Sequence, residues 1–87
     1  MDLRHVRSFL ALAKTLSFSR TAEIGHLSQP ALSLQIQALE EEIAGKLFER
    51  DRRKTVLTVA AVAFQNEASG GLAQLEQAIG STRPAAA

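Results

Sequence analysis

The sequence predicts a mainly α-helical fold that contains one short β-hairpin and ends in a long helix. Three observations lead to this class. Apolar residues recur at helical spacing through most of the 87 residues, and a Gly-His-Leu turn at 25–27 separates two helical segments. Two short β-prone runs, 47–50 and 55–58, flank a polar cluster, which is typical of a hairpin. A chain of this length forms one domain with a thin core.

The first two helices are predicted from amphipathic spacing and capping residues. The first covers residues 2–14, with Asp2 as its N-cap. Its buried stripe consists of Leu3, Val6, Phe9, Leu10 and Ala13. A short second helix over 20–24 follows a break that offers two capping serines, Ser17 and Ser19. The turn then leads directly into a third helix.

The third helix carries the most information about function. Ser28 can cap it through its hydroxyl, and Pro30 is tolerated in the first turn, where N–H groups have no intrahelical partner. One face is a core stripe made of Leu32, Ile36, Leu39 and Ile43. A different face is free to contact another molecule and consists of Gln29, Pro30, Ser33, Leu34 and Gln37. We expect Gly45 to end this helix as its left-handed residue.

The remaining segments predict a hairpin with a basic tip and a fourth helix. We name the hairpin the wing; its tip is the cluster 51–54. Thr58 is the candidate N-cap of a helix over 59–82, in which a near-heptad seam runs through Ala61, Gln65, Ala68, Leu72, Leu75 and Ile79. Such a seam indicates a partner helix. Pro84 cannot continue the helix, so 83–87 are expected to form a flexible tail.

The composition excludes several classes of function. The chain has no cysteine and two isolated histidines, so we expect no disulfide, no metal site and no cofactor. We find no pair of nucleophile and base and no phosphate-binding glycine loop, which makes an enzyme the weakest hypothesis. There is no apolar run of membrane-spanning length and no secretory signal pattern, so we expect a cytoplasmic protein.

The distribution of charge along the chain favours a nucleic-acid partner more than the net charge does. The net charge is only +1, but Arg50, Arg52, Arg53 and Lys54 gather at the wing, away from the acidic run Glu40 to Glu42. A basic hairpin tip suits phosphate contacts or insertion of an arginine into the minor groove. The alternative is a loop whose charges serve only solubility.

The free face of the third helix has the chemistry to read DNA bases. Gln29 can pair with an adenine through two hydrogen bonds, Pro30 and Ala31 can touch a thymine methyl, and Ser33 can hold a phosphate oxygen. A helix that enters the major groove presents such side chains from its first turns. The alternative is a solvated polar face. A second rival hypothesis is a helical interaction module, in which the seam over 61–79 binds a different protein.

The motifs together resemble the N-terminal domain of LysR-type transcriptional regulators over about residues 2 to 80. The residues that carry the resemblance are Ala22, Ser28-Gln29-Pro30-Ala31-Leu32-Ser33, Gln35-Ile36, Leu39-Glu40, Leu47-Phe48-Glu49-Arg50 and Leu57-Thr58. The resemblance implies a bacterial winged helix-turn-helix, here 1–58, followed by a linker helix, here 59–82, that pairs antiparallel with that of a second copy. It also implies a homodimer on an inverted repeat in promoter DNA. A small-molecule inducer would act only through an effector domain absent from this chain.

The resemblance and the patterns above define two sets of site residues. The family's base-reading positions correspond to Gln29, Pro30, Ala31 and Leu34, its phosphate contacts include Ser33, and its wing contacts correspond to Arg50, Arg52 and Arg53. With Ser28 and Gln37, the predicted DNA-binding set is Ser28, Gln29, Pro30, Ala31, Ser33, Leu34, Gln37, Arg50, Arg52 and Arg53. The predicted dimerisation set is Ala61, Phe64, Ala68, Leu72, Leu75 and Ile79.

Four features of the sequence depart from the family pattern, the last of them a pair of glycines. Leu34 stands where arginine or another polar residue is common, which leaves only apolar contact there. Gly25 replaces a usual core leucine, so helix two is weakened unless Ile24 compensates, and Ala61 replaces a usual glycine. Gly70 and Gly71 lie in the middle of the linker helix. They either weaken the dimer or let two linker helices approach closely, and both interpretations stay open.

Overall fold

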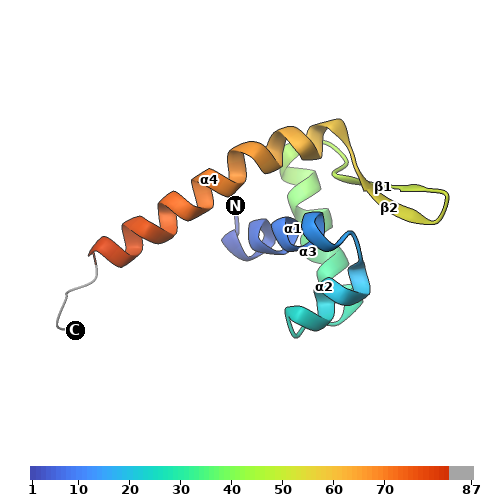
Figure 1. Cartoon of the computed structure of the whole chain (residues 1–87), viewed down its shortest axis with the longest axis horizontal. Helices are drawn as coiled ribbons and strands as arrows, with labels where there is room; N and C mark the ends of the chain where they lie inside the picture. Colours follow the sequence, from blue (N-terminus) through green and yellow to red (C-terminus); the bar gives the residue numbers. More distant parts are fainter. Residues whose placement is uncertain (83–87) are drawn as a thin grey trace.

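The structure, a computed structural model of the chain, describes residues 1–82 and has the predicted fold class (Figure 1). The predicted tail at 83–87 lies outside the described residues. The elements in chain order are α1 (Leu3–Thr15), α2 (Phe18–Ile24), α3 (Gln29–Ile43), β1 (Phe48–Asp51), β2 (Lys54–Leu57) and α4 (Val59–Thr82). Helices α1 to α3 form a compact head, from which the wing and α4 project in opposite directions (Figure 1). Within residues 1–82, no helix is both long and apolar enough to cross a membrane.

Three predicted helix caps are confirmed. The Asp2 carboxylate accepts a hydrogen bond from the Arg4 backbone N–H at 2.8 Å. The Ser28 hydroxyl accepts one from the Ala31 N–H at 3.1 Å. Thr58 accepts from the N–H of residue 61 at 3.1 Å and donates its own hydroxyl hydrogen to the carbonyl oxygen of residue 46 at 2.7 Å. Thr58 therefore starts α4 and ties it to the segment before the wing.

Helix α2 begins earlier than the sequence predicts. Ser17 has an extended backbone, and its hydroxyl accepts a hydrogen bond from the Arg20 N–H at 3.1 Å. Because an N-cap bonds the N–H two or three positions later, Phe18 and Ser19 belong to the helix. Ser17 is thus the cap, and Ser19 lies in the first turn.

The prediction that Gly45 ends α3 as its left-handed residue is wrong. Ala44 takes that conformation, with φ 62°, and no glycine among the described residues has a positive φ. The Ala44 N–H bonds the Glu41 carbonyl at 3.3 Å, and the Gly45 N–H bonds the Glu40 carbonyl at 3.1 Å. This pair of bonds is a Schellman motif, which places the left-handed residue one position before the glycine.

The wing is tighter than predicted. The register pairs Phe48 with Leu57 and Asp51 with Lys54, so only Arg52 and Arg53 remain in the turn. The predicted tip of four residues was too long because its outer pair belongs to the ladder. The turn residues have φ values of 50° and 69°, which define the type I′ turn that two-residue hairpins favour.

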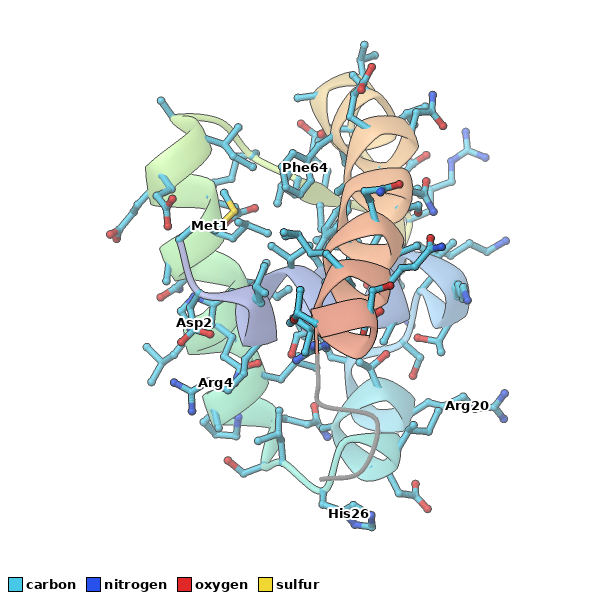
Figure 2. The ribbon with its side chains drawn as sticks, turned by 90° about the vertical axis from the view of Figure 1, so that its left-hand side faces the viewer. Met1, Asp2, Arg4, Arg20, His26 and Phe64 are labelled. Atoms are coloured by element: carbon cyan, nitrogen blue, oxygen red, sulfur yellow. The ribbon has the colours of Figure 1, made fainter. Side chains whose placement is uncertain are left out.

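The core joins all parts of the head to the start of α4. Its buried members are Val6, Phe9, Leu12, Ala13, Ala22, Leu32, Ile36, Leu39, Leu47 and Ala61. The Phe9 ring lies at its centre, with centroid distances of 5.6 Å to Phe48 and 5.3 Å to Phe64. Figure 2 shows Phe64 on the side of α4 that faces the head. The wing and α4 are therefore held at fixed places relative to α3.

The departure at Gly25 has a simple structural reason. Gly25 is the exposed C-cap of α2, so no core side chain is missing from the helix itself. Ile24 does not compensate for a leucine, since its side chain is 63% exposed. Leu27, which follows the turn, packs against the core instead.

Candidate nucleic-acid interface

A groove brings the free face of α3 and the wing together. Its walls come from α3, the start of α2 and both strands of the wing, and its polar lining includes Ser17, Ser19, Gln29, Ser33, Gln37, Lys46, Arg50, Arg53, Lys54 and Thr55. Gln29, Ser33, Gln37, Arg50 and Arg53 belong to the predicted DNA-binding set. Residues about twenty positions apart in the sequence thus share one concave surface.

Helix α3 presents this surface because its opposite side is fixed in the core. Leu32, Ile36 and Leu39 are buried, as the predicted stripe requires, while Gln29 and Gln37 are exposed. The amide groups of those two glutamines face solvent from the free side of the helix. They are available to an external partner.

Two short contacts fix the positions of the first three helices. The Ser8 hydroxyl donates a hydrogen bond to the Gln35 side chain, which joins α1 to α3. The Thr15 and Thr21 hydroxyls share a hydrogen bond at 2.6 Å, which joins the end of α1 to α2. Thr21 is buried, and no buried side-chain polar atom among the described residues lacks a partner. The head is therefore a rigid support for the exposed face of α3.

The other members of the predicted set are placed differently. Ser28 is exposed, but its hydroxyl already accepts the capping bond. Pro30 is exposed and Ala31 half-buried in the first turn of α3. Leu34 is 66% exposed and lies outside the lining of the groove. The groove and the tip of α3 are thus two adjacent parts of one surface.

The wing supplies positive charge on the opposite wall of the groove. All four cations from Arg50 to Lys54 are exposed. The Arg50 guanidinium donates a hydrogen bond to the Arg53 carbonyl oxygen at 3.2 Å. Arg52, the other residue of the turn, is exposed and is not part of the groove lining. The wing therefore carries cations both within and outside the groove lining.

Sequence reasoning missed several groove residues. Lys54 belongs to the basic cluster that the sequence assigns to phosphate contacts, but it is not in the predicted DNA-binding set. Lys46 belongs to no motif, and the sequence predicts Ser17 and Ser19 only as helix caps. The fold brings them in because α2 begins at the edge of the groove.

Glu40 and Glu42, two members of the acidic run, have partners outside the wing. Glu40 lines the groove, but one carboxylate oxygen accepts the Leu47 N–H at 2.8 Å and the other lies 3.9 Å from the Lys46 ammonium. Glu42 lies 3.7 Å from the N-terminal amine. Hence Glu40 fixes the segment before the wing through the Leu47 N–H, and Glu42 lies beside the N-terminal amine.

The two residues with a shifted pKa, Asp2 and Arg4, are not part of the groove lining. A side-chain hydrogen bond from Arg4 lowers the pKa of Asp2 to about 2, and the same contact raises the pKa of Arg4. Figure 2 places both residues beside Met1, on the opposite side of the head from Arg20. Among residues 1–82, no group of three or more His, Asp or Glu side chains is arranged to hold a metal ion. The groove lining combines hydrogen-bonding groups and four cations, Lys46, Arg50, Arg53 and Lys54, with two carboxylates, Glu40 and Glu49, and this excess of cations suits an anionic partner.

The predicted dimerisation set divides into two parts. Ala61 is fully buried in the chain's own core, and Phe64 and Ala68 pack against that core. Leu72 is half-buried, while Leu75 and Ile79 are each 49% exposed. The same helix face thus covers the head over its first half and is open to a partner over its second half.

The fold and the groove define a winged helix-turn-helix domain. The family model for bacterial regulatory helix-turn-helix proteins of the lysR family matches residues 3–62. The chain belongs to this LysR family.

Curated relatives agree with this assignment. The Hca operon transcriptional activator HcaR of Escherichia coli strain K12 is 47% identical over 78 residues, which cover 90% of this chain and 26% of that protein. The HTH-type transcriptional regulator TfdT of Cupriavidus pinatubonensis is 42% identical over 77 residues, which cover 88% and 34% respectively. The chain therefore spans a quarter to a third of these relatives. Both relatives are named as transcriptional regulators.

Solved structures have the same fold. The DNA-binding domain of BenM, crystallised with catB site 1 DNA, superposes with a TM-score of 0.88 and 37% identity, over 95% of this chain and 89% of that one. The DNA-binding domain of CbnR, in a complex with DNA, gives a TM-score of 0.89 and 33% identity over 100% of both chains.

Proposed function

We propose that this chain binds double-stranded DNA sequence-specifically, as the DNA-binding domain of a LysR-type transcriptional regulator. The observation that carries the proposal is the groove, which joins the exposed glutamines of α3 to the arginines of the wing. Two relatives of the same fold are known in complexes with DNA. Whether the regulator activates or represses transcription depends on the whole protein.

Helix α3 enters the major groove with its N-terminal end first. That groove is about 12 Å wide and accepts one helix. Gln29 hydrogen-bonds an adenine edge, Pro30 and Ala31 contact a thymine methyl, and the Ser33 hydroxyl bonds a phosphate oxygen. The buried stripe on the other side of α3 fixes the angle at which these side chains meet the bases.

The wing contacts the backbone and the adjacent minor groove. Arg50 and Arg53 line the groove on the protein and face the same side as α3, so they neutralise phosphates next to the major-groove contact. Arg52 is exposed in the turn of the wing, outside the groove lining, and suits insertion into the minor groove, where the potential is more negative. The wing supplies affinity, and α3 supplies most of the discrimination.

The dimer forms through α4. Leu72, Leu75 and Ile79 continue the apolar face of α4 beyond the head, where a second copy can cover it. Two such heads would meet successive major grooves of an inverted repeat. The chain covers only 26% and 34% of two full-length relatives, and an inducer would bind the part that this chain does not include. A regulator that acts on a bacterial chromosome works in the cytoplasm, where we place it.

Salt dependence of binding tests the proposal. Fluorescence anisotropy with a labelled duplex selected from a random pool should show log affinity falling linearly with log salt, by about 0.9 for each phosphate neutralised. Arg53→Ala should reduce the slope by about 1 and weaken selected and random duplexes alike. Lys14→Ala, an exposed cation at the end of α1, is the matched control. Affinity that is independent of salt, or equal effects of both substitutions, would contradict the proposal.

A further inference from the structure

Leu34 is an exposed apolar side chain on an otherwise polar face. Its side chain is 66% exposed, and it lies in the second turn of α3. Pro30 is exposed one turn earlier and Gln37 one turn later, so all three are neighbours on the helix surface. Gln37 also lines the groove, which makes the surface around Leu34 continuous with the proposed DNA interface.

The rest of α3 limits which bases this helix can read. Between Gln29 and Ile43 there is no lysine or arginine, the side chains that make the commonest specific contact with guanine. Gln35 is occupied by the Ser8 hydroxyl. Of the two exposed glutamines on α3, Gln29 and Gln37, Gln37 is the neighbour of Leu34, and a glutamine amide matches the N6 and N7 groups of adenine.

The geometry points to Leu34 as a specificity residue that contacts the C5-methyl group of a thymine in the major groove. The inference rests on the proposed function, because it assigns one base contact within that interface. A C5-methyl group also occurs on 5-methylcytosine. We assign the contact to thymine because thymine pairs with adenine, the base that a neighbouring glutamine at position 37 can hydrogen-bond.

The test replaces thymines of a bound duplex one at a time. The chain is first used to select duplexes from a random pool, and each thymine of the enriched half-site is then changed to deoxyuridine, which lacks only the methyl group. Anisotropy should show one position at which the wild-type chain loses about fourfold in affinity, the factor implied by one buried methyl-sized group. Leu34→Ala should bind thymine and uracil equally at that position.

A second position supplies the internal control. Any thymine that faces Pro30 or Ala31 should stay sensitive to deoxyuridine in Leu34→Ala, because those side chains are unchanged. If the loss of affinity on replacing each thymine by deoxyuridine is the same in the wild type and in Leu34→Ala, the proposed role of Leu34 is wrong. If a 5-methylcytosine–guanine pair at the Leu34 position binds as well as the thymine–adenine pair, the assignment to thymine is wrong.

The proposed function and the role of Leu34 fail in different ways. If the pool yields no enriched sequence and binding does not depend on salt, the proposed function itself fails. If specific, salt-dependent binding persists in Leu34→Ala without any change in the thymine preference, only the role of Leu34 fails. Leu34→Arg adds a positive test, since it should shift the preferred base pair at that position toward guanine.

Discussion

Arg50 braces the tip of the wing by donating a hydrogen bond to the Arg53 carbonyl oxygen at 3.2 Å. The brace spans a turn in which Arg52 and Arg53 have φ values of 50° and 69°. This left-handed region costs a residue with a side chain about 1–2 kcal/mol, and such turns favour Asn-Gly. The wing therefore carries two cations at positions where they lower stability. We interpret this as stability given up for charge at the DNA.

Replacing the turn pair by Arg52→Asn together with Arg53→Gly should stabilise the fold and weaken DNA binding. The free energy of unfolding should rise by about 1–2 kcal/mol, because asparagine and glycine adopt this turn with little strain. The slope of log affinity against log salt should fall by about 0.9 or more, because the variant leaves the phosphate contacted by Arg53 without a neutralising cation. Urea unfolding and anisotropy measure the two effects.

The double lysine variant at the same two positions is the control for the wing. It keeps both charges and both left-handed residues, so stability and salt slope should stay near those of the wild type. If the Asn-Gly variant were less stable than the wild type, the account of a strained turn would be contradicted.

Acid should remove a stabilising interaction at the start of α1. The hydrogen bond from Arg4 holds the pKa of Asp2 at about 2, below its ordinary value of 3.8. A carboxylate with a lowered pKa stabilises the fold above its ordinary pKa, and this stabilisation is lost as the pH falls through the folded-state value. Asparagine keeps the cap without the charge. In thermal unfolding, the melting temperature of the wild type should exceed that of Asp2→Asn at pH 5, and the difference should disappear between pH 3.8 and pH 2. A gap that stays constant would disprove this role.

The glycine pair in α4 should be replaceable by alanine. A Cβ at Gly70 or Gly71 would meet nothing within 4 Å, and both residues are exposed in a regular helix. Each substitution should stabilise the helix by about 1 kcal/mol. Circular dichroism should show a higher melting temperature, and sedimentation should show a dimer at least as strong as the wild type. If the variant were more stable but dimerised more weakly, we would infer that the backbone of a partner helix packs against these glycines.

The local signals in the sequence were sufficient for most of the fold. Asp2, Ser28 and Thr58 cap helices as predicted, because capping depends on residue type and on the few residues that follow. The core stripe of α3 is buried because its spacing fits one helix face. The basic cluster lies on the wing as predicted. Its two-residue turn was not predicted, because arginine is not a residue type that indicates a positive φ.

The parts that could not be predicted depend on tertiary packing. A heptad-like seam indicates that one face of a helix is buried, but it does not indicate which element covers that face. Phe64 and Ala68 proved to be covered by the chain's own head, through contacts with residues far away in the sequence such as Phe9. Lys46 enters the groove for the same reason, because only the packing of the wing on α3 places it there.

The separation of roles between α3 and the wing is the central claim, and Gln29→Ala tests it most directly. The measurement is the ratio of affinities for a selected duplex and a random duplex at one salt concentration. Because a bidentate base contact contributes about 1–3 kcal/mol of discrimination, the ratio should fall about fivefold or more while binding to random DNA stays near the wild-type level. Equal losses on both duplexes, with the ratio unchanged, would contradict the account.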